Sequence, residues 1–424
     1  MIRRSGLGLA LCLLLVCASG AQAKRPDGII PDIPTGSSPP SWSVVHGSPL
    51  AHSASLPYRG GPVLHSNRTH VIFWAPGGSG LAYPPGYEAL VERFLAGVAA
   101  DSHKPTNVYS LSGQYADSSG PAAYASAYGG AVLDTDALPR RGCSEPPLTG
   151  PGWTLCVNDA QIQTEIAHVI GTDNLPTSDH DIYFLVMPEG LGACVAGGPD
   201  YCSLGGTTPA GTPLGSFCGY HSATSDGILY AVIPFNGVNG HCQSANPRPN
   251  SSTADPTIST ISHEHNEMVT DPYASAWIDP YTSYENGDLC ITAYSRELGG
   301  SGAGAWNEVI GGGHYFLQAE WSNWDQGCAG RTEPDTASFP APAHPWAAQT
   351  LKFTARAHAA HGSIVAYNWF FGDRPTGRHR SASHTYRRGG SYRVVLRTTD
   401  NAGLWAYFAR TLRVGKPVAL RRGG

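Results

Sequence analysis

Hydrophobic residues along positions 69–101 follow two different spacings, one typical of a strand and one of a helix. The run THVIFWAP at 69–76 is rich in β-branched and aromatic residues, which favours a strand. In the next stretch, at 86–101, apolar residues recur three or four positions apart, as on one face of an amphipathic helix. They are Leu90, Val91, Phe94, Leu95 and Val98. This order predicts a strand followed by a helix.

The alternation of strand and helix patterns continues toward residue 272. A second helical pattern occupies 159–170, and buried-strand patterns occupy 181–187 and 228–235. Residues 255–272 form a further helical pattern, in which Asp255 suits a cap and Pro272 stops the helix. The order predicts an α/β (α+β) domain with long glycine-rich loops.

A proline-rich stretch at 331–346 separates this region from one with a different period. Apolar and polar residues alternate there in short runs, at 364–373, 384–386, 389–403 and 405–414, which predicts a small all-β sandwich. The motifs YNWFFGD, HTY and GSYRVVLRTTDNAG resemble the PKD repeat, an immunoglobulin-like module. Arg374 departs from the pattern, in which glycine commonly follows the aspartate. The resemblance implies a spacer or a surface-binding module attached to an exported protein.

The start of the chain has the order of a secretory signal peptide. Arg3 and Arg4 precede a long apolar run that ends in small residues before Lys24. We therefore expect a signal peptide at 1–23 and a secreted product. The remaining expected boundaries are a Pro/Ser/Gly-rich flexible leader at 24–64, an α/β domain at 65–330, a linker at 331–339, the PKD domain at 340–416 and a tail at 417–424.

The net charge and the hydropathy of the chain argue against nucleic acid as a partner and against a membrane span. Removal of the signal leaves 25 basic and 32 acidic residues, a net charge of −7. This balance disfavours nucleic acid as a partner, because phosphate binding needs a basic face. No uninterrupted apolar stretch after the signal is long enough to span a membrane. We expect an extracellular protein or a cell-wall or matrix polymer as the partner, and the sequence leaves the oligomeric state open.

Eight cysteines remain after the signal, an even number that indicates disulfides in an exported chain. We expect neighbouring cysteines to pair: Cys143 with Cys156, Cys194 with Cys202, Cys218 with Cys242, and Cys290 with Cys328. Thiolate zinc ligands are the alternative, but no close Cys-x-x-Cys pair is present.

The segment SHEHNEMVTDP at 262–272 carries the main candidate chemistry. On a helix, His263 and Glu267 are four residues apart and share a face, so both can reach one metal ion. Glu264 stands one step round the helix, where a carboxylate can take a proton from water. This is the layout of the zincin helix, with Glu267 in place of the second histidine. The segment predicts a zinc site with Glu264 as the catalytic base.

A third ligand is expected downstream, in WIDPYTSYENGDLC at 277–290. We favour Glu285, with Asp288 second and Asp279 as a further acidic residue. His265 points off the shared face and is expected beside the site or on the surface. The further histidine candidates for the same cleft are His221 and His241.

Two alternatives to zinc stay open. Glu267 can instead be a calcium ligand together with Asp271, Asp279 and Asp288, since calcium prefers several oxygens. The same residues can also form a metal-free hydrogen-bond network that holds the helix end to the loop.

Seven motifs in 69–330 together resemble the exported Exordium, or phosphate-induced protein, family. They are DIYFLVM, FCGYH, YAVIPF with Cys242, ISHEHNEMVTDP, AWID, ENGDLC and YFLQAEWSNWDQGC. The resemblance implies an exported, wall- or matrix-associated protein with a degenerate zincin helix, on which His263, Glu264 and Glu267 occupy the motif. His265 departs from the family's usual aliphatic residue.

The sequence thus predicts a zincin-like domain stapled by disulfides, followed by a PKD sandwich. The predicted activity is zinc-dependent hydrolysis of a peptide bond, with His263, Glu267 and Glu285 as ligands. The first alternative is a non-enzymatic binding protein of the matrix or cell wall with a degenerate site. A carbohydrate-active enzyme ranks third, because it needs two opposed carboxylates but no substrate-stacking motif accompanies them.

Overall fold

The computed structural model of the protein describes residues 27–31, 55–140, 142–143, 148–195, 201–332 and 335–416. The expected signal peptide, most of the expected leader and the expected tail lie outside these residues. Within the part of the chain that is described, no helix has the length and apolar character needed to cross a membrane.

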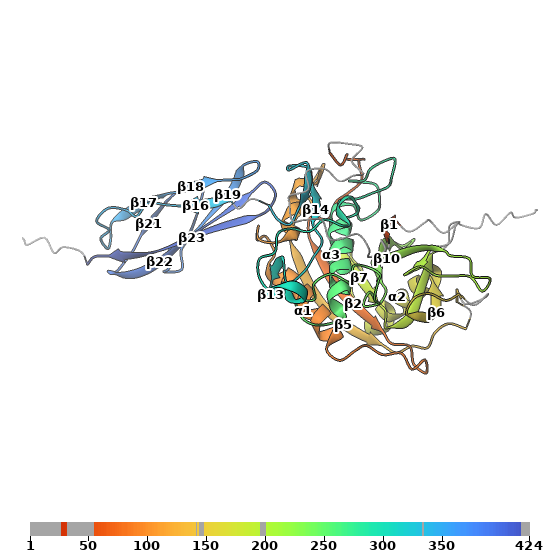
Figure 1. Cartoon of the computed structure of the whole chain (residues 1–424). Coiled ribbons are helices and arrows are strands. Elements are labelled where there is room, and N and C mark those ends of the chain that lie inside the picture. Colours follow the sequence, from red (N-terminus) through yellow and green to blue (C-terminus); the bar gives the residue numbers. More distant parts are fainter. Residues whose placement is uncertain are drawn as a thin grey trace, which may run out of the picture.

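The first part of the chain is mixed α/β (Figure 1). Its helices are α1 (Tyr87–Ala100), α2 (Asp159–Asp173) and α3 (Ala254–Thr270), with 3-10 turns η1 (Val108–Gln114), η2 (Asp288–Cys290) and η3 (Gly302–Gly304). The strands of its main sheet are β1 (Asp27–Pro31), β2 (Asn67–Trp74), β5 (Ser126–Asp134), β6 (Trp153–Asn158), β7 (Asp181–Val186), β8 (Gly190–Val195), β9 (Tyr201–Ser203), β10 (Gly215–Ala223) and β11 (Leu229–Ile233). Short hairpins are formed by β3 (Ala116–Asp117) with β4 (Gly120–Pro121), β12 (Glu308–Ile310) with β13 (Gly313–Tyr315), and β14 (Glu320–Ser322) with β15 (Gly327–Ala329). The strands and helices predicted within 69–272 are confirmed, with shifts of a few residues at their ends.

The main sheet has the order β5-β2-β7-β11-β10-β9-β8-β6, and β1 also pairs with β10. The pairs from β5 through β11 are parallel, whereas β10 is antiparallel to β11. The direction of the strands therefore changes between β11 and β10, and it changes again between β9 and β8.

Helices cover both faces of this sheet. In β7, Ile182 and Phe184 join the core formed with α1 and α3, whereas Tyr183 and Leu185 join the core formed with α2. Alternate residues of a strand point to opposite faces, so a fully apolar strand fits a sheet covered on both sides. Each face buries enough apolar surface to hold its helix in a defined position.

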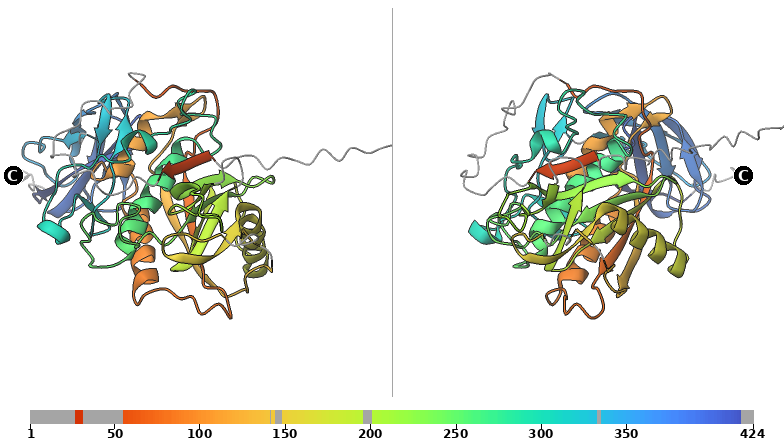
Figure 2. Two further views of the ribbon diagram at one scale, coloured as in Figure 1. Left: turned by 45° about the vertical axis from the view of Figure 1, so that its right-hand side comes forward. Right: turned by 90° about the vertical axis from the view of Figure 1, so that its right-hand side faces the viewer.

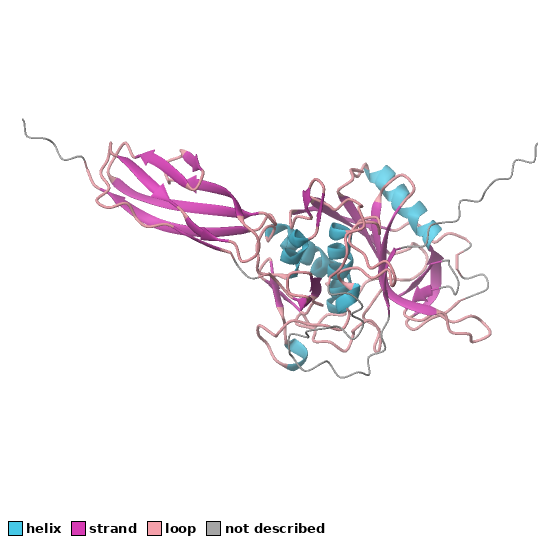
Figure 3. Ribbon diagram, turned by 90° about the horizontal axis from the view of Figure 1, so that it is seen from above, coloured by secondary structure: helices cyan, strands magenta, loops and turns pink. Residues whose placement is uncertain are grey.

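Helix α3 is buried along its whole length. Its first turn is held by Asp255, whose carboxylate accepts a hydrogen bond from the Ser252 backbone N–H at 3.1 Å. The helix ends at Thr270, two residues before Pro272, which has no N–H for a further helical bond. Figure 3 shows the helices of this part grouped around the sheet.

All four predicted disulfides are confirmed: Cys143–Cys156, Cys194–Cys202, Cys218–Cys242 and Cys290–Cys328. The last one closes a separation of 38 residues and joins the 285–290 segment to β15. By restricting the unfolded chain, such a bond stabilises the fold by about 2–4 kcal/mol.

Two expected connecting segments carry structure. Within the expected leader, residues 27–31 form β1, and Leu56, Val63 and Leu64 are buried in the main body. Within the expected linker, β16 (Thr336–Ser338) pairs with β18 (Arg356–His358). Only the leader was expected to be flexible, because its composition shows little apolar periodicity, and the linker was expected as a proline-rich spacer. Pairing with β10 and with β18 gives the described parts of these segments their strand structure.

The C-terminal part is a β-sandwich, as predicted (Figure 3). Its other strands are β17 (Thr350–Thr354), β19 (Ile364–Phe370), β20 (Thr376–Arg378), β21 (Ser381–Thr385), β22 (Gly390–Asp400) and β23 (Trp405–Val414). Its core contains Trp369, Phe353, Tyr386 and Leu396. It contacts the first part through His103, whose ring stacks on Trp405 at 4.1 Å between centroids and whose Nδ1 lies 2.8 Å from the Gly403 carbonyl oxygen.

Candidate metal centre

Helix α3 brings His263 and Glu267 together as their spacing predicts. The Nε2 atom of His263 lies 3.0 Å from Oε1 of Glu267, and both side chains are almost fully buried. Although burial opposes it, the charge of Glu267 raises the pKa of His263 well above its usual range. The close contact also fits two ligands of one cation.

The segment after α3 supplies Asp288 to this pair. The Asp288 backbone N–H donates a hydrogen bond of 3.0 Å to Glu267 Oε1, and Asp288 Oδ1 lies 3.7 Å from His263 Nε2. The glycine before Asp288, Gly287, leaves room for His263, because a Cβ atom at position 287 would lie 2.8 Å from the His263 ring. Thus Asp288, the second choice in the sequence, is the one placed beside His263.

Glu285, the favoured third ligand, lies beside a different histidine. Its Oε2 atom is 3.5 Å from Nε2 of His221, which projects from β10. His221 Nδ1 is in turn 3.7 Å from Oε2 of Glu267. The sequence placed His221 only among further candidates, because nothing in a β-strand pattern shows which helix the strand faces.

Glu264 also contacts His221. Its Oε2 atom lies 2.9 Å from His221 Nδ1, and both side chains are fully or almost fully buried. A carboxylate on one ring nitrogen is the arrangement that leaves the other nitrogen available to a metal ion. The residue predicted as the catalytic base therefore also orients a candidate ligand.

The residues thus form two groups of potential ligands that share Glu267. One group is His221, Glu267 and Glu285, and the other is His263, Glu267 and Asp288; within each, the ligating atoms lie within 4.8 Å of one another. We call these the His221 group and the His263 group. The sequence predicted a single ligand set, His263, Glu267 and Glu285, which combines members of both groups.

Several oxygen and nitrogen atoms of the two groups are buried without a hydrogen-bonding partner among the described residues. They are His221 Nε2, His263 Nε2, Glu264 Oε1, Glu267 Oε2, both carboxylate oxygens of Glu285, and Asp288 Oδ1. Buried polar atoms are normally paired, and each unpaired one costs about 1–3 kcal/mol. Such a concentration of unpaired ligand atoms fits a cation-binding site, and the donor set of imidazole and carboxylate suits zinc.

Burial and mutual repulsion shift the titration of these groups. Burial and the charge of Asp288 raise the pKa of Glu267 to about 7. Burial, together with the charge of Glu267, raises the pKa of Glu285 well above its usual range. Burial lowers the pKa of His221 to about 3, so this imidazole is neutral at pH 7. A neutral imidazole is the form that binds a metal.

The centre is held in place by polar contacts from β14 and the residues before it. Gln318 Nε2 donates to the Gly287 carbonyl oxygen at 2.7 Å and lies 3.0 Å from His263 Nδ1. Asn286 donates to Glu320 at 3.2 Å and accepts from Thr270 at the end of α3 at 2.9 Å. Neither Gln318 nor Glu320 was singled out as a site residue in the sequence, although both lie in one of the motifs that resemble the Exordium family.

The remaining candidate residues belong to neither ligand group; some of their side chains accept hydrogen bonds from backbone N–H groups. His265 is buried on another face of α3, where its Nε2 lies 2.9 Å from the Asn67 side-chain oxygen. His241 is half-buried and belongs to neither group. Asp271 and Asp279, the other proposed calcium ligands, accept backbone N–H bonds, from Ser275 and Tyr281 respectively.

Access to the centre is restricted in this structure. A cavity of about 10 Å³ adjoins His263, room for about one water molecule, and is lined partly by Ser259, Thr260 and Gln318. Strand β1 lies along β10, with Asp27 opposite His221 in the register (Figure 2). A substrate therefore needs a rearrangement of covering elements to reach the ligands.

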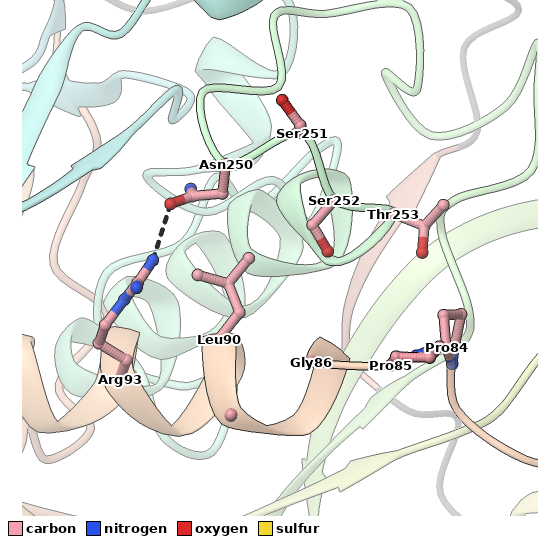
Figure 4. Close-up of a pocket in the computed structure, with 10 residues that line it drawn as sticks. Pro84, Pro85, Gly86, Leu90, Arg93, Asn250, Ser251, Ser252 and Thr253 are labelled. Atoms are coloured by element: carbon pink, nitrogen blue, oxygen red, sulfur yellow. Dashed lines mark hydrogen bonds between the residues drawn. The ribbon is translucent and has the colours of Figure 1, made fainter.

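A larger cavity, of about 550 Å³, lies between the start of α1 and the loop before α3 (Figure 4). Residues from Pro84 to Arg93 and from Asn250 to Thr253 line it, and Arg93 donates a hydrogen bond of 2.7 Å to Asn250 across it. No member of the two ligand groups lines this cavity, so it does not provide a route to the centre.

Comparison with known proteins identifies the C-terminal part. The family profile of the PKD domain matches residues 332–414, so the chain carries a PKD domain there. Among solved structures, the PKD1 domain of Epp from Vibrio anguillarum has 27% identity, covers 20% of this chain and 98% of its own, and has a TM-score of 0.19. The PKD1 domain of the Vibrio cholerae metalloprotease PrtV has 23% identity, covers 19% and 94%, and has a TM-score of 0.17.

One solved structure extends over most of the chain. OgpA from Akkermansia muciniphila covers 84% of this chain and 96% of its own, with 10% identity and a TM-score of 0.19. Similarity this low assigns no fold to the first part. The zincin-like fold and the relation to the Exordium family therefore stay predictions.

Proposed function

We propose that residues 55–330 form a secreted, metal-dependent hydrolase of peptide bonds and that the PKD domain is its accessory module. The observation that carries the proposal is the convergence of two imidazoles and three further carboxylates around Glu267, with many of their ligand atoms unpaired. The PKD domain is consistent with this, because a similar domain occurs in a Vibrio cholerae metalloprotease.

The ligands come from both groups, with Glu267 common to them. A bound zinc ion supplies a Lewis acid that polarises a carbonyl group and lowers the pKa of water to about 7. Glu264 holds His221 through one oxygen and keeps the other, Oε1, unpaired and able to take a proton. The same carboxyl can later give that proton to the leaving amine.

A Glu264→Gln substitution tests the role of this carboxyl. The amide keeps the size of the side chain but cannot take a proton, so peptide turnover should fall by about 100-fold or more while bound metal is retained. Turnover of a fluorescent casein and metal content by mass spectrometry are measured on the same samples. Turnover equal to that of the parent would show that Glu264 is not the base.

The burial of the centre favours a second candidate function, a non-enzymatic binding protein of the matrix or cell wall. The two histidines and four carboxylates are each at most 3% exposed. In that case the cluster is structural and the PKD domain supplies adhesion. Protein purified without chelators that holds no metal and cleaves no peptide would favour this candidate over the hydrolase.

A further inference from the structure

We propose that the centre holds two divalent cations, one in the His221 group and one in the His263 group, with Glu267 as the carboxylate between them. This inference rests on the proposed function only in assigning a metal to these residues, and it concerns the number of ions. The sequence predicted a single ion.

The first support is the geometry of the two groups. They have only Glu267 in common, and its two oxygens face different partners. Oε1 lies 3.0 Å from His263 Nε2, whereas Oε2 lies 3.7 Å from His221 Nδ1, the nitrogen that Glu264 also contacts. A carboxylate that turns one oxygen to each of two ligand groups is suited to bridge two ions, as in hydrolases with paired metals about 3.5–4 Å apart.

The second support is the balance of charge. Glu264, Glu267, Glu285 and Asp288 are each at most 3% exposed. Among the described residues, their ion-pair partners are His221 and His263, with no lysine or arginine. A buried carboxylate needs a compensating charge or a proton. Glu320 and Asp271 are buried beside these four carboxylates as well. One divalent cation balances the charge of only two carboxylates, so two cations leave much less acidic charge uncompensated.

The third support is the set of unpaired atoms, which is divided between the groups. His221 Nε2 and both oxygens of Glu285 are unpaired on one side, and His263 Nε2 and Asp288 Oδ1 on the other. A single ion bound by one group leaves the ligand atoms of the other without a partner. Two ions satisfy both sides.

The two groups differ in whether the hydrogen bonds of their histidine already suit metal binding at Nε2. In the His221 group, Glu264 already holds Nδ1, so Nε2 is free to bind. In the His263 group, Gln318 donates to the Gly287 carbonyl oxygen, which fixes its amide nitrogen against His263 Nδ1. The amide therefore turns an N–H donor toward Nδ1, and metal binding at Nε2 requires Gln318 to turn so that its oxygen faces Nδ1. The His221 group should therefore bind first and more tightly.

The test is to count ions bound to the untagged, metal-stripped protein. The protein is dialysed to equilibrium against a series of Zn²⁺ concentrations, and bound zinc is measured by mass spectrometry. We expect two ions per chain, the second bound at least tenfold more weakly. His263→Ala should remove the weaker ion, His221→Ala the tighter one, and Glu267→Ala should weaken both. Circular dichroism shows whether each variant is folded.

Two control variants exclude binding elsewhere. Glu165→Gln removes a carboxylate from the separate acidic group of Asp134, Asp136 and Glu165, and His180→Ala removes an exposed imidazole. Neither should change the count. A loss of one ion in Glu165→Gln would place the second ion outside the centre and overturn the proposal.

Cobalt provides a second readout that does not depend on activity or on the variants. The fully loaded Co²⁺ protein should show magnetic coupling between the two ions, which a single-ion site cannot show. A count of one ion, lost in both histidine variants, overturns the two-ion proposal and leaves the hydrolase proposal standing. A count of zero overturns both, whereas two coupled ions without peptide turnover overturn only the hydrolase.

Discussion

Glu267 is the residue on which the candidate centre depends. Its spacing from His263 follows from helix geometry, so this pair could be predicted from sequence. Its contacts with His221 and Asp288 depend on a strand and a loop that approach α3 only in the folded chain. The sequence therefore named all five histidine and acidic residues of the two groups and also Glu264, with His221 only as a further candidate, but it did not show how they are grouped.

Gly287 makes room for the centre, and its substitution should disturb metal binding. In Gly287→Ala the new Cβ atom would lie 2.8 Å from the His263 ring and 3.0 Å from Glu267 Oε1, so the His263 group must shift. We expect zinc affinity to fall by at least tenfold, measured by competition with a chelating dye. Gly171→Ala in α2, where nothing lies within 4 Å of the new atom, is the matched control. Equal affinity in all three proteins would contradict this account of Gly287.

Glu308 should make stability depend on pH. Burial raises its pKa to about 8, although Arg331 opposes this shift. Between about pH 4.5 and pH 8 the folded chain holds a proton at this carboxyl that the unfolded chain has lost. The contribution to stability is therefore complete below about pH 4.5 and is lost as pH rises toward 8.

Urea unfolding across this pH range measures the effect of Glu308. The parent should lose on the order of several kcal/mol of unfolding free energy relative to Glu308→Gln as the pH rises from 4.5 to 8. Glu189→Gln, an exposed substitution, is the control. If the difference between the parent and Glu308→Gln does not change with pH, Glu308 does not titrate as described.

At the scale of elements, β10 connects the sheet to the centre. It pairs with β11 on one edge, and on its other edge β9 and β1 pair with successive parts of it. Strand β1 belongs to the expected leader, whose composition predicts little structure of its own. Among the described residues, β10 is the strand that pairs with β1, so β1 should be the least stable part of the sheet.

Deletion of residues 24–31 should uncover the edge of β10. We expect amide hydrogen exchange in a peptide covering 215–223 to rise by at least tenfold, because its N–H and carbonyl groups lose partners. Peptides from β2 and β7 in the same sample are internal controls. Unchanged exchange in 215–223 would show that β1 does not protect this edge.

At the scale of the molecule, the PKD domain has its own core and also contacts the first part. The backbone N–H of Trp405 donates a 2.8 Å hydrogen bond to the His103 carbonyl oxygen, and the side-chain rings of the two residues stack. The rings of Trp324 and His361 also stack between the two parts, at 4.6 Å between centroids. The domains should therefore fold separately but influence each other's stability.

Trp405→Ala tests this coupling. Loss of the stacked ring should weaken the contact by about 0.5–1.5 kcal/mol and separate the thermal unfolding of the two parts in calorimetry. Phe370→Ala removes an aromatic ring of β19 that is 42% exposed, and it should leave the transitions unchanged. A Trp405→Ala profile identical to that of the parent would mean that the stacked rings do not couple the domains.

The sequence by itself determined helices α1, α2 and α3 and strands β2, β7 and β11 within 69–272, the β-sandwich and the four disulfides; strands β5, β6, β8, β9 and β10 were not predicted. These features follow from local periodicity, from turn residues and from cysteines close along the chain. It also identified the His263–Glu267 pair, because one turn of helix relates the two residues. Tertiary structure alone decided that Glu285 joins His221 while Asp288 joins His263, and that β1 covers β10. Those contacts join segments tens to hundreds of residues apart, and local spacing carries no information about which of them meet.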